Sequence, residues 1–166
     1  MTFEDRAEAV AAFGFTNRQA RFLVTVMTHS GVCVGRQYCD FAGISYGEPV
    51  RTLFRTLEAG RYATVNPSGH GRGRIFHVHY KPLYRAIGQA ENRFRRPAPL
   101  PRAVERLMVL DMVTADRSVT WLGTEREKVR EFTTRVGVPL AALPCLTFRS
   151  SNLESDTVPE ETTRYF

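Results

Sequence analysis

The sequence has little cysteine, almost no lysine and no long apolar run, and each shortage excludes a class of protein. The three cysteines are an odd number without framework spacing, so no disulfide scaffold is encoded. No apolar stretch approaches the ~20 residues of a membrane span. The chain begins with MTFEDRAEAV, which is acidic and amphipathic, whereas a secretory signal is basic and then continuously apolar. We therefore expect a reduced, cytoplasmic protein without a membrane partner.

Acidic residues are nearly absent from one segment, and this gives the chain a basic stripe. The formal net charge is +6, and residues 61–102 contain nine basic side chains against Glu91 alone. A polyanion is the natural partner of such a stripe because each neutralised phosphate releases condensed counterions, although solubility alone is an alternative. Of the 23 basic residues all but Lys81 and Lys128 are arginine. Arginine suits bidentate contacts to phosphate or guanine, but genomic base composition can also produce this bias.

The first half of the chain has the sequence signals of four helices and a hairpin. With 166 residues, 43% of them hydrophobic, the chain can bury a stable core without disulfide bonds or a structural metal ion. Capping residues, apolar periodicity and glycine stops predict four helices, over residues 2–13, 16 to about 31, 34–42 and 47–59. Thr16 with Gln19 is the expected capping pair of the second helix, and Ser45 with Glu48 that of the fourth. Extended runs at 62–66 and 74–80 flank the glycine-rich PSGHGRG, which predicts a hairpin.

The second half has weaker patterns. One or two helical turns are expected in KPLYRAIG, and the proline- and arginine-rich residues 89–99 are typical of a linker. We also expect a helix over 100–115, a strand over 119–122, and a helix over 124–136 that is capped by Thr124 with Glu127. The tail is polar and acidic, so we expect disorder there unless its terminal Tyr165 and Phe166 dock. The predicted domains are 1–88, a linker at 89–99, a helical extension at 100–148 and a disordered tail at 149–166.

The order of these elements resembles a winged helix-turn-helix. In this resemblance 16–30 is the first core helix, 34–42 the second, 47–59 the recognition helix and 62–80 the wing. The passage LFRTLEAGRYATV is similar to the step from recognition helix to wing in bacterial regulators of this class. The fold class is thus α+β and mostly helical, with an N-terminal helix before the winged helix and additional helices after it. The resemblance implies sequence-specific binding of double-stranded DNA, by a transcriptional regulator that acts as a repressor.

Several passages are also similar to replication-relaxation proteins of bacterial mobile elements. The segments concerned are GFTNRQARFL, LEAGRYATV, GHGRGRIFHVHYKPLYRAIG and RAVERLMVLDMVTAD. This resemblance implies maintenance of a plasmid or integrative element, or transcriptional control within one.

The candidate DNA-binding residues lie on the predicted recognition helix and in the predicted wing. The apolar stripe of the helix leaves arginines and threonines facing solvent, where they fit the major groove. Glycines in the wing allow the backbone to approach a partner, so its basic residues suit phosphates or a narrow minor groove. The predicted set is Tyr46, Arg51, Thr52, Arg55, Thr56, His70, Arg72 and Arg74. A solvated helix face and a plain hairpin turn are the alternatives.

Other patterns are weaker, and we expect neither catalysis nor a cofactor. The wing glycines lack the lysine and the strand-to-helix context of a phosphate-binding loop. His77 and His79 share a strand face but lack a third metal ligand, and Cys33 with Cys39 are explained more simply as buried apolar residues than as a redox or zinc pair. No catalytic triad or carboxylate pair has a supporting context. A protein-interaction module and an accessory domain of a nuclease remain alternative functions.

A homodimer is the last expectation from the sequence. Six apolar residues crowd the helix predicted at 100–115: Leu107, Met108, Val109, Leu110, Met112 and Val113. Pairing of this helix with its copy would place two recognition helices in successive major grooves, about 34 Å apart.

Overall fold

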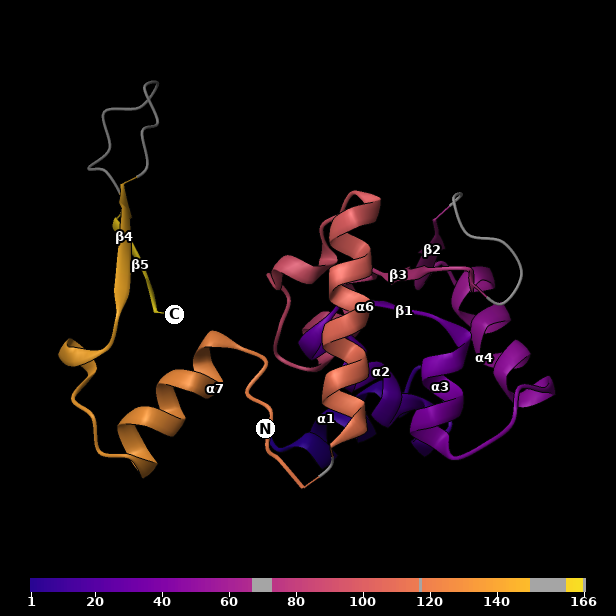
Figure 1. Cartoon of the computed structure of the whole chain (residues 1–166), viewed down its shortest axis with the longest axis horizontal. Coiled ribbons are helices and arrows are strands. Elements are labelled where there is room, and N and C mark those ends of the chain that lie inside the picture. The colour runs from indigo at the N-terminus through magenta and orange to yellow at the C-terminus, as the bar shows by residue number, and fades with distance from the viewer. Residues whose placement is uncertain (67–72, 117, 150–160, 166) are drawn as a thin grey trace. The chain divides into compact units, whose positions relative to one another are not determined.

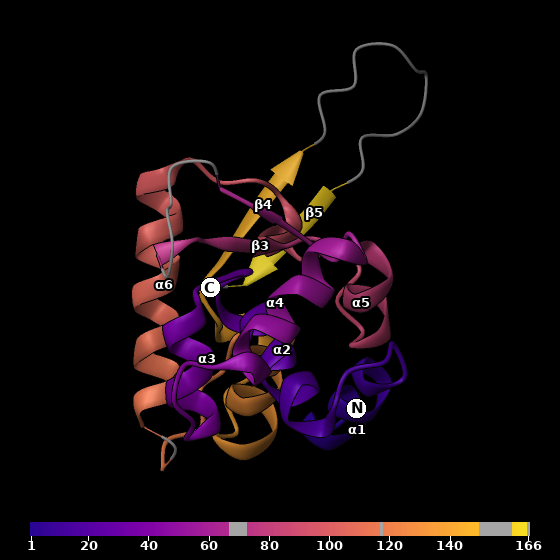
Figure 2. The ribbon, with the colours of Figure 1, turned by 90° about the vertical axis from the view of Figure 1, so that its right-hand side faces the viewer.

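The fold was analysed in a computed structural model, which describes residues 1–66, 73–116, 118–149 and 161–165. The chain divides into two compact units, Met1–Val119 and Thr120–Phe166. Unit 1 is α+β and mostly helical, with a small antiparallel sheet (Figures 1 and 2). Its elements are α1 (Phe3–Ala11), α2 (Asn17–His29), β1 (Val32–Cys33), α3 (Gly35–Ala42), α4 (Glu48–Ala59), β2 (Ala63–Val65), β3 (Phe76–Val78), α5 (Lys81–Ala86), the 3₁₀ turn η2 (Arg93–Arg95) and α6 (Leu100–Ala115).

Local capping signals set the first helices as predicted. The Thr16 hydroxyl accepts a bond from the Gln19 backbone, and the Gln19 side chain accepts one from the Thr16 backbone, which completes a capping box at α2. Thr2 and Asp5 form the same box at α1. Gly43 ends α3 in the left-handed conformation, with φ 64°. The predicted helices at these positions are confirmed.

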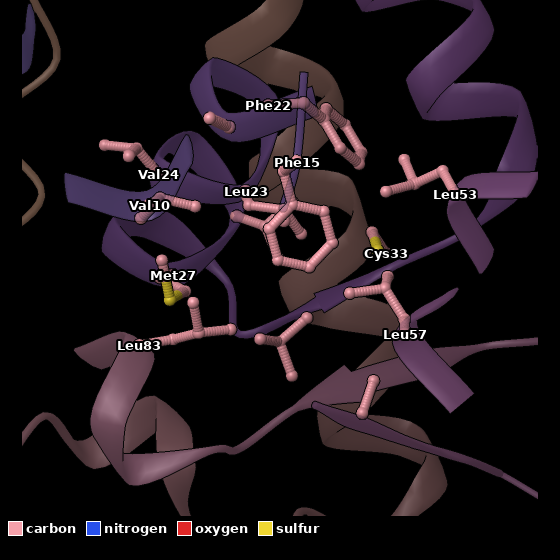
Figure 3. Packing of buried hydrophobic residues seen from close by; sticks show 14 of the residues in the cluster. Val10, Phe15, Phe22, Leu23, Val24, Met27, Cys33, Leu53, Leu57 and Leu83 are labelled. Atoms are coloured by element: carbon pink, nitrogen blue, oxygen red, sulfur yellow. The ribbon is translucent and has the colours of Figure 1, made fainter. Parts of the chain in front are cut away.

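The core of unit 1 lies around α2, whose side chains are buried on nearly every side. Phe22, Leu23 and Met27 are fully buried there, together with Leu53 and Leu57 from α4 (Figure 3). α2 is covered by α1, α3 and α6. Because α4 contributes only one apolar stripe to this core, its opposite face remains exposed to solvent.

The sheet confirms the predicted hairpin and adds a strand that was not predicted. β2 and β3 are antiparallel, with Thr64 opposite His77. β1 pairs antiparallel with the other edge of β3, where Cys33 lies opposite Phe76, so the strand order is β1-β3-β2. Because β1 has only two residues, it is too short to show the alternation of apolar and polar residues from which a strand is predicted.

The boundary between the units lies later than the expected linker. Within 89–99, η2 packs against α2 and Phe94 is only 8% exposed. α6 packs against α2, α3 and β1. The Gln37 amide of α3 donates to the Leu107 carbonyl and the Asp111 carboxylate of α6, both at 2.8 Å. Apolar contacts and these bonds join α6 to unit 1, so the division falls after Val119.

Unit 2 contains a helix and a hairpin. Its elements are α7 (Glu125–Arg130), which continues as the π-helical η3 (Glu131–Arg135), then the 3₁₀ turn η4 (Leu140–Ala142), β4 (Cys145–Arg149) and β5 (Glu161–Tyr165). The predicted capping box of Thr124 with Glu127 is confirmed. The strand expected over 119–122 is wrong, because those residues have no regular structure.

The described end of the tail forms a strand. We expected disorder over 149–166 unless Tyr165 and Phe166 docked; among the described residues of the tail, Glu161–Tyr165 forms β5, antiparallel to β4, with Cys145 opposite Tyr165. The sequence of this stretch contains two threonines, whose β-branched side chains favour an extended backbone. Because the stretch has little apolar area to bury, the backbone hydrogen bonds to β4 are what stabilises it.

Candidate nucleic-acid interface

α4 presents its polar residues on the face opposite the core. Val50, Leu53, Phe54 and Leu57 are buried at a helical spacing. The other face carries Arg51, Thr52 and Arg55, which are exposed, and Thr56, which is half-buried. The side chains of Arg51 and Arg55 are 55% and 68% exposed. Both guanidinium groups can therefore reach a partner in solvent.

Glu48 binds this polar face rather than capping the helix. The residue before α4 is Gly47, which has no side-chain cap, so the predicted pairing of Ser45 with Glu48 is wrong. The Glu48 carboxylate instead accepts from Arg51 Nε at 3.0 Å, Arg55 Nη2 at 3.2 Å and the Thr52 hydroxyl at 3.3 Å. The hydrogen bond from Arg51, with the nearby charge of Arg55, lowers the pKa of Glu48. Two cations beside the carboxylate form a better partner than one backbone N–H, which explains the failed prediction.

A hollow of about 280 Å³ lies between α4, the start of α3 and β3. It is lined by Gly35, Tyr46, Arg51, Phe54, Arg55, Glu58, Arg74 and Phe76. Gly35 leaves room for the Tyr46 ring, since a Cβ there would lie 2.8 Å from Tyr46 Cε2. Four of the predicted DNA-binding residues, Tyr46, Arg51, Arg55 and Arg74, thus surround one concave site.

Arg74 is held beside α4 by two contacts. Its Nη2 donates to Glu58 Oε1 at 2.6 Å, and its guanidinium carbon lies 5.2 Å from the centre of the Phe76 ring. Phe76 packs in turn on Phe54, with ring centres 4.3 Å apart. The base of the hairpin is therefore fixed against the polar face of α4.

The structure brings some of the predicted residues together and leaves others apart. Thr52 and Thr56 lie on α4 but do not line the hollow. His70 and Arg72 lie outside the described residues. Glu58 was not predicted, because its partner Arg74 is 16 positions away and only the folded hairpin brings the two together.

The weaker candidates have structural explanations. His77 Nε2 donates to the Phe94 carbonyl at 2.8 Å, and its ring centre lies 5.6 Å from that of His79. Within the described residues no three side chains of His, Cys, Asp or Glu are grouped to hold a metal ion. Cys33 is a free thiol whose pKa is raised by burial, which disfavours the reactive thiolate.

Comparison of the chain with models of protein families, with curated proteins and with solved structures gives no match. In the part of the chain that the structure describes, no helix has the length and apolar character needed to cross a membrane. Chemically, the hollow and the face of α4 offer guanidinium donors and aromatic walls, a combination suited to phosphates and to the edges of bases.

Proposed function

We propose that this chain binds double-stranded DNA with a winged helix-turn-helix in unit 1 and acts as a transcriptional regulator, a repressor, within a bacterial mobile element. α2, α3 and α4 would be its helical core, with α4 as recognition helix and the β2–β3 hairpin as wing. The observation that carries the proposal is the convergence of Arg51, Arg55, Arg74 and Tyr46 around one hollow. Such a site lets a helix in the major groove and the base of a wing contact the same duplex.

The electrostatics support this partner. α4 exposes two arginines whose counterion, Glu48, is itself exposed and replaceable by phosphate. Arginine in the major groove bonds guanine O6 and N7, and the threonines of α4 suit thymine methyl groups or phosphates. The net charge of +8 over residues 61–102 adds attraction that is independent of sequence.

A homodimer joined through α6 is the second part of the proposal. Ala103 and Leu110 face the core, whereas Leu100, Val104, Met108 and Met112, four residues apart, are 40%, 45%, 66% and 52% exposed. Two antiparallel copies of α6 centred on Met108 would place Val104 of one copy opposite Met112 of the other. Leu110 was also expected among the apolar residues of the dimer interface, but it is fully buried within unit 1 and does not belong to that interface.

The test begins with capture of genomic fragments by the purified protein, followed by sequencing, which identifies a target. Titration of that target should then show that Arg51→Ala and Arg55→Ala each lower the specific affinity by roughly 1–3 kcal/mol. Arg18→Ala removes the same charge from the exposed surface of α2 and is the matched control. Equal losses in all three variants, or no enriched fragment, would contradict the proposal.

A further inference from the structure

Phe94 anchors a second group of cations, away from the hollow. Phe94 is 8% exposed, and it is held by hydrogen bonds from its N–H to Asn92 Oδ1 and from His77 Nε2 to its carbonyl, both 2.8 Å. Gly31, in the left-handed region with φ +71°, lies directly against it, since a Cβ there would be 2.6 Å from the Phe94 oxygen. Segment 92–95 is therefore a fixed platform on unit 1.

Arginines surround this platform. The guanidinium carbons of Arg93 and Arg106 each lie 5.2 Å from the centre of the Phe94 ring. Arg95 is tied by its Nη1 to the Ala90 carbonyl at 2.7 Å, and Arg96 is exposed beside it. Stacking on an aromatic ring restricts a guanidinium before any ligand binds, which lowers the entropy lost on binding. We call Arg93, Arg95, Arg96 and Arg106 the Phe94 cluster.

The Phe94 cluster has no ion pair within the described residues, and the one carboxylate that its charge influences, that of Glu91, is bonded to Lys81. None of its four arginines forms an ion pair there, while the nearby carboxylates of Glu91 and Glu105 are paired with Lys81 at 3.1 Å and Arg102 at 2.7 Å. Desolvation by burial and the charge of Arg93 lower the pKa of Arg106. Among the described residues, Arg95 Nε, Arg106 Nη1 and His79 Nε2 are buried without a hydrogen-bond partner. The cluster thus holds four positive charges that no ion pair neutralises within the described residues, which favours binding of an anion.

The Phe94 cluster lies on a different side of unit 1 from α4. In Figure 1 the segment between α5 and α6 runs to the left of α6, whereas α4 lies on the right. A straight duplex in contact with α4 would leave this side of unit 1 open.

We propose that the Phe94 cluster binds the backbone phosphates of a second segment of duplex DNA, so that the protein bridges two DNA segments. Guanidinium groups pair with phosphate oxygens in a bidentate manner, and backbone contacts of this kind require no particular sequence. The inference rests on the proposed function, because the first segment is the one bound by α4.

The test is a capture experiment with two duplexes. The target duplex is immobilised and saturated with the full-length protein, and a labelled duplex without the target sequence is then added. Wild type should retain the labelled duplex, and Arg93→Gln/Arg96→Gln should lose that retention while still binding the immobilised target. Both replaced side chains are exposed, so the anchoring of Phe94 is left in place. In wild type, retention of the labelled duplex should fall steeply as the salt concentration rises, because the contacts are to phosphates.

Arg126→Gln/Arg130→Gln removes the same charge from exposed positions of α7 and should retain the labelled duplex like wild type. Retention by Arg93→Gln/Arg96→Gln would overturn the inference, since bridging would then arise elsewhere, for example from a dimer. Failure of wild type to retain the second duplex would overturn it as well. Failure of wild type to bind the first duplex would remove the proposed function together with it.

Discussion

Single residues determine how closely segment 92–95 approaches the core. Gly31 and Gly88 have nearly equal positive φ angles, +71° and +72°. A Cβ added at Gly31 would lie within 4 Å of Phe94, whereas a Cβ added at Gly88 would have no neighbour within that distance. Gly88→Ala should therefore lose about 1–2 kcal/mol of unfolding free energy from backbone strain alone. Gly31→Ala should lose clearly more, because its Cβ also collides with the backbone of Phe94. Chemical denaturation of both variants measures the difference, and equal losses would show that the contact with Phe94 is loose.

His77 makes stability depend on pH. Burial lowers its pKa from the ordinary 6.5, the bond to the Phe94 carbonyl opposes this, and the charges of His79 and Arg106 add to it. The unfolded chain therefore binds a proton more readily, so stability declines as pH falls through 6.5 toward the lowered folded pKa and levels off below it.

Replacing His77 with Gln should remove this pH dependence of stability. Unfolding free energies measured at about pH 7.5 and about pH 5.5 should differ less in the variant than in wild type. An imidazole titration of native His77 with its midpoint above 6.5 would contradict the assignment.

At the scale of elements, most local sequence signals predicted the structure correctly, although the capping pair of Ser45 with Glu48 and the strand over 119–122 were wrong. The capping boxes at α2 and α7 predicted those helices, because each box lies within four consecutive residues, and the Thr2 cap with its first-turn acids predicted α1. The hairpin was predicted from its glycine-rich turn. Of the four predicted residues that line the hollow, Arg51 and Arg55 came from the polar face of α4, Tyr46 from the turn before it and Arg74 from the basic segment before β3. β1, β5 and the pair of Glu58 with Arg74 depend on partners brought close only by folding, so no local pattern predicted them.

In the proposed complex, Glu48 competes with DNA for the arginines of α4. Its carboxylate pairs with Arg51 and Arg55, so a phosphate that binds them would have to displace it and would also be repelled by it. Glu48→Gln should tighten DNA binding several-fold, with the gain larger at low salt because exposed charges are screened. Titration at two salt concentrations measures this, and Glu8→Gln, which removes an exposed charge from α1, is the control. Weaker binding by Glu48→Gln would instead indicate that the carboxylate contacts a base.

At the scale of the whole molecule, the exposed side of α6 determines the oligomeric state that we propose. Met108 and Met112 are 66% and 52% exposed on that side. Met108→Glu and Met112→Glu should shift sedimentation from dimer to monomer at micromolar concentration, because each places a charge in the apolar seam. Arg102→Glu changes an exposed residue away from the seam and should leave the dimer intact. A wild type that sediments only as monomer would remove the dimer from the proposal.

The division of the chain after Val119 places its single tryptophan and most of its tyrosines in different units. Trp121 and Tyr165 belong to Thr120–Phe166, whereas the other five tyrosines belong to Met1–Val119. Indole emission will therefore report the melting of the C-terminal part, and the change in tyrosine absorbance mainly that of the N-terminal part. One unlabelled sample can thus reveal whether the two parts unfold together or in succession.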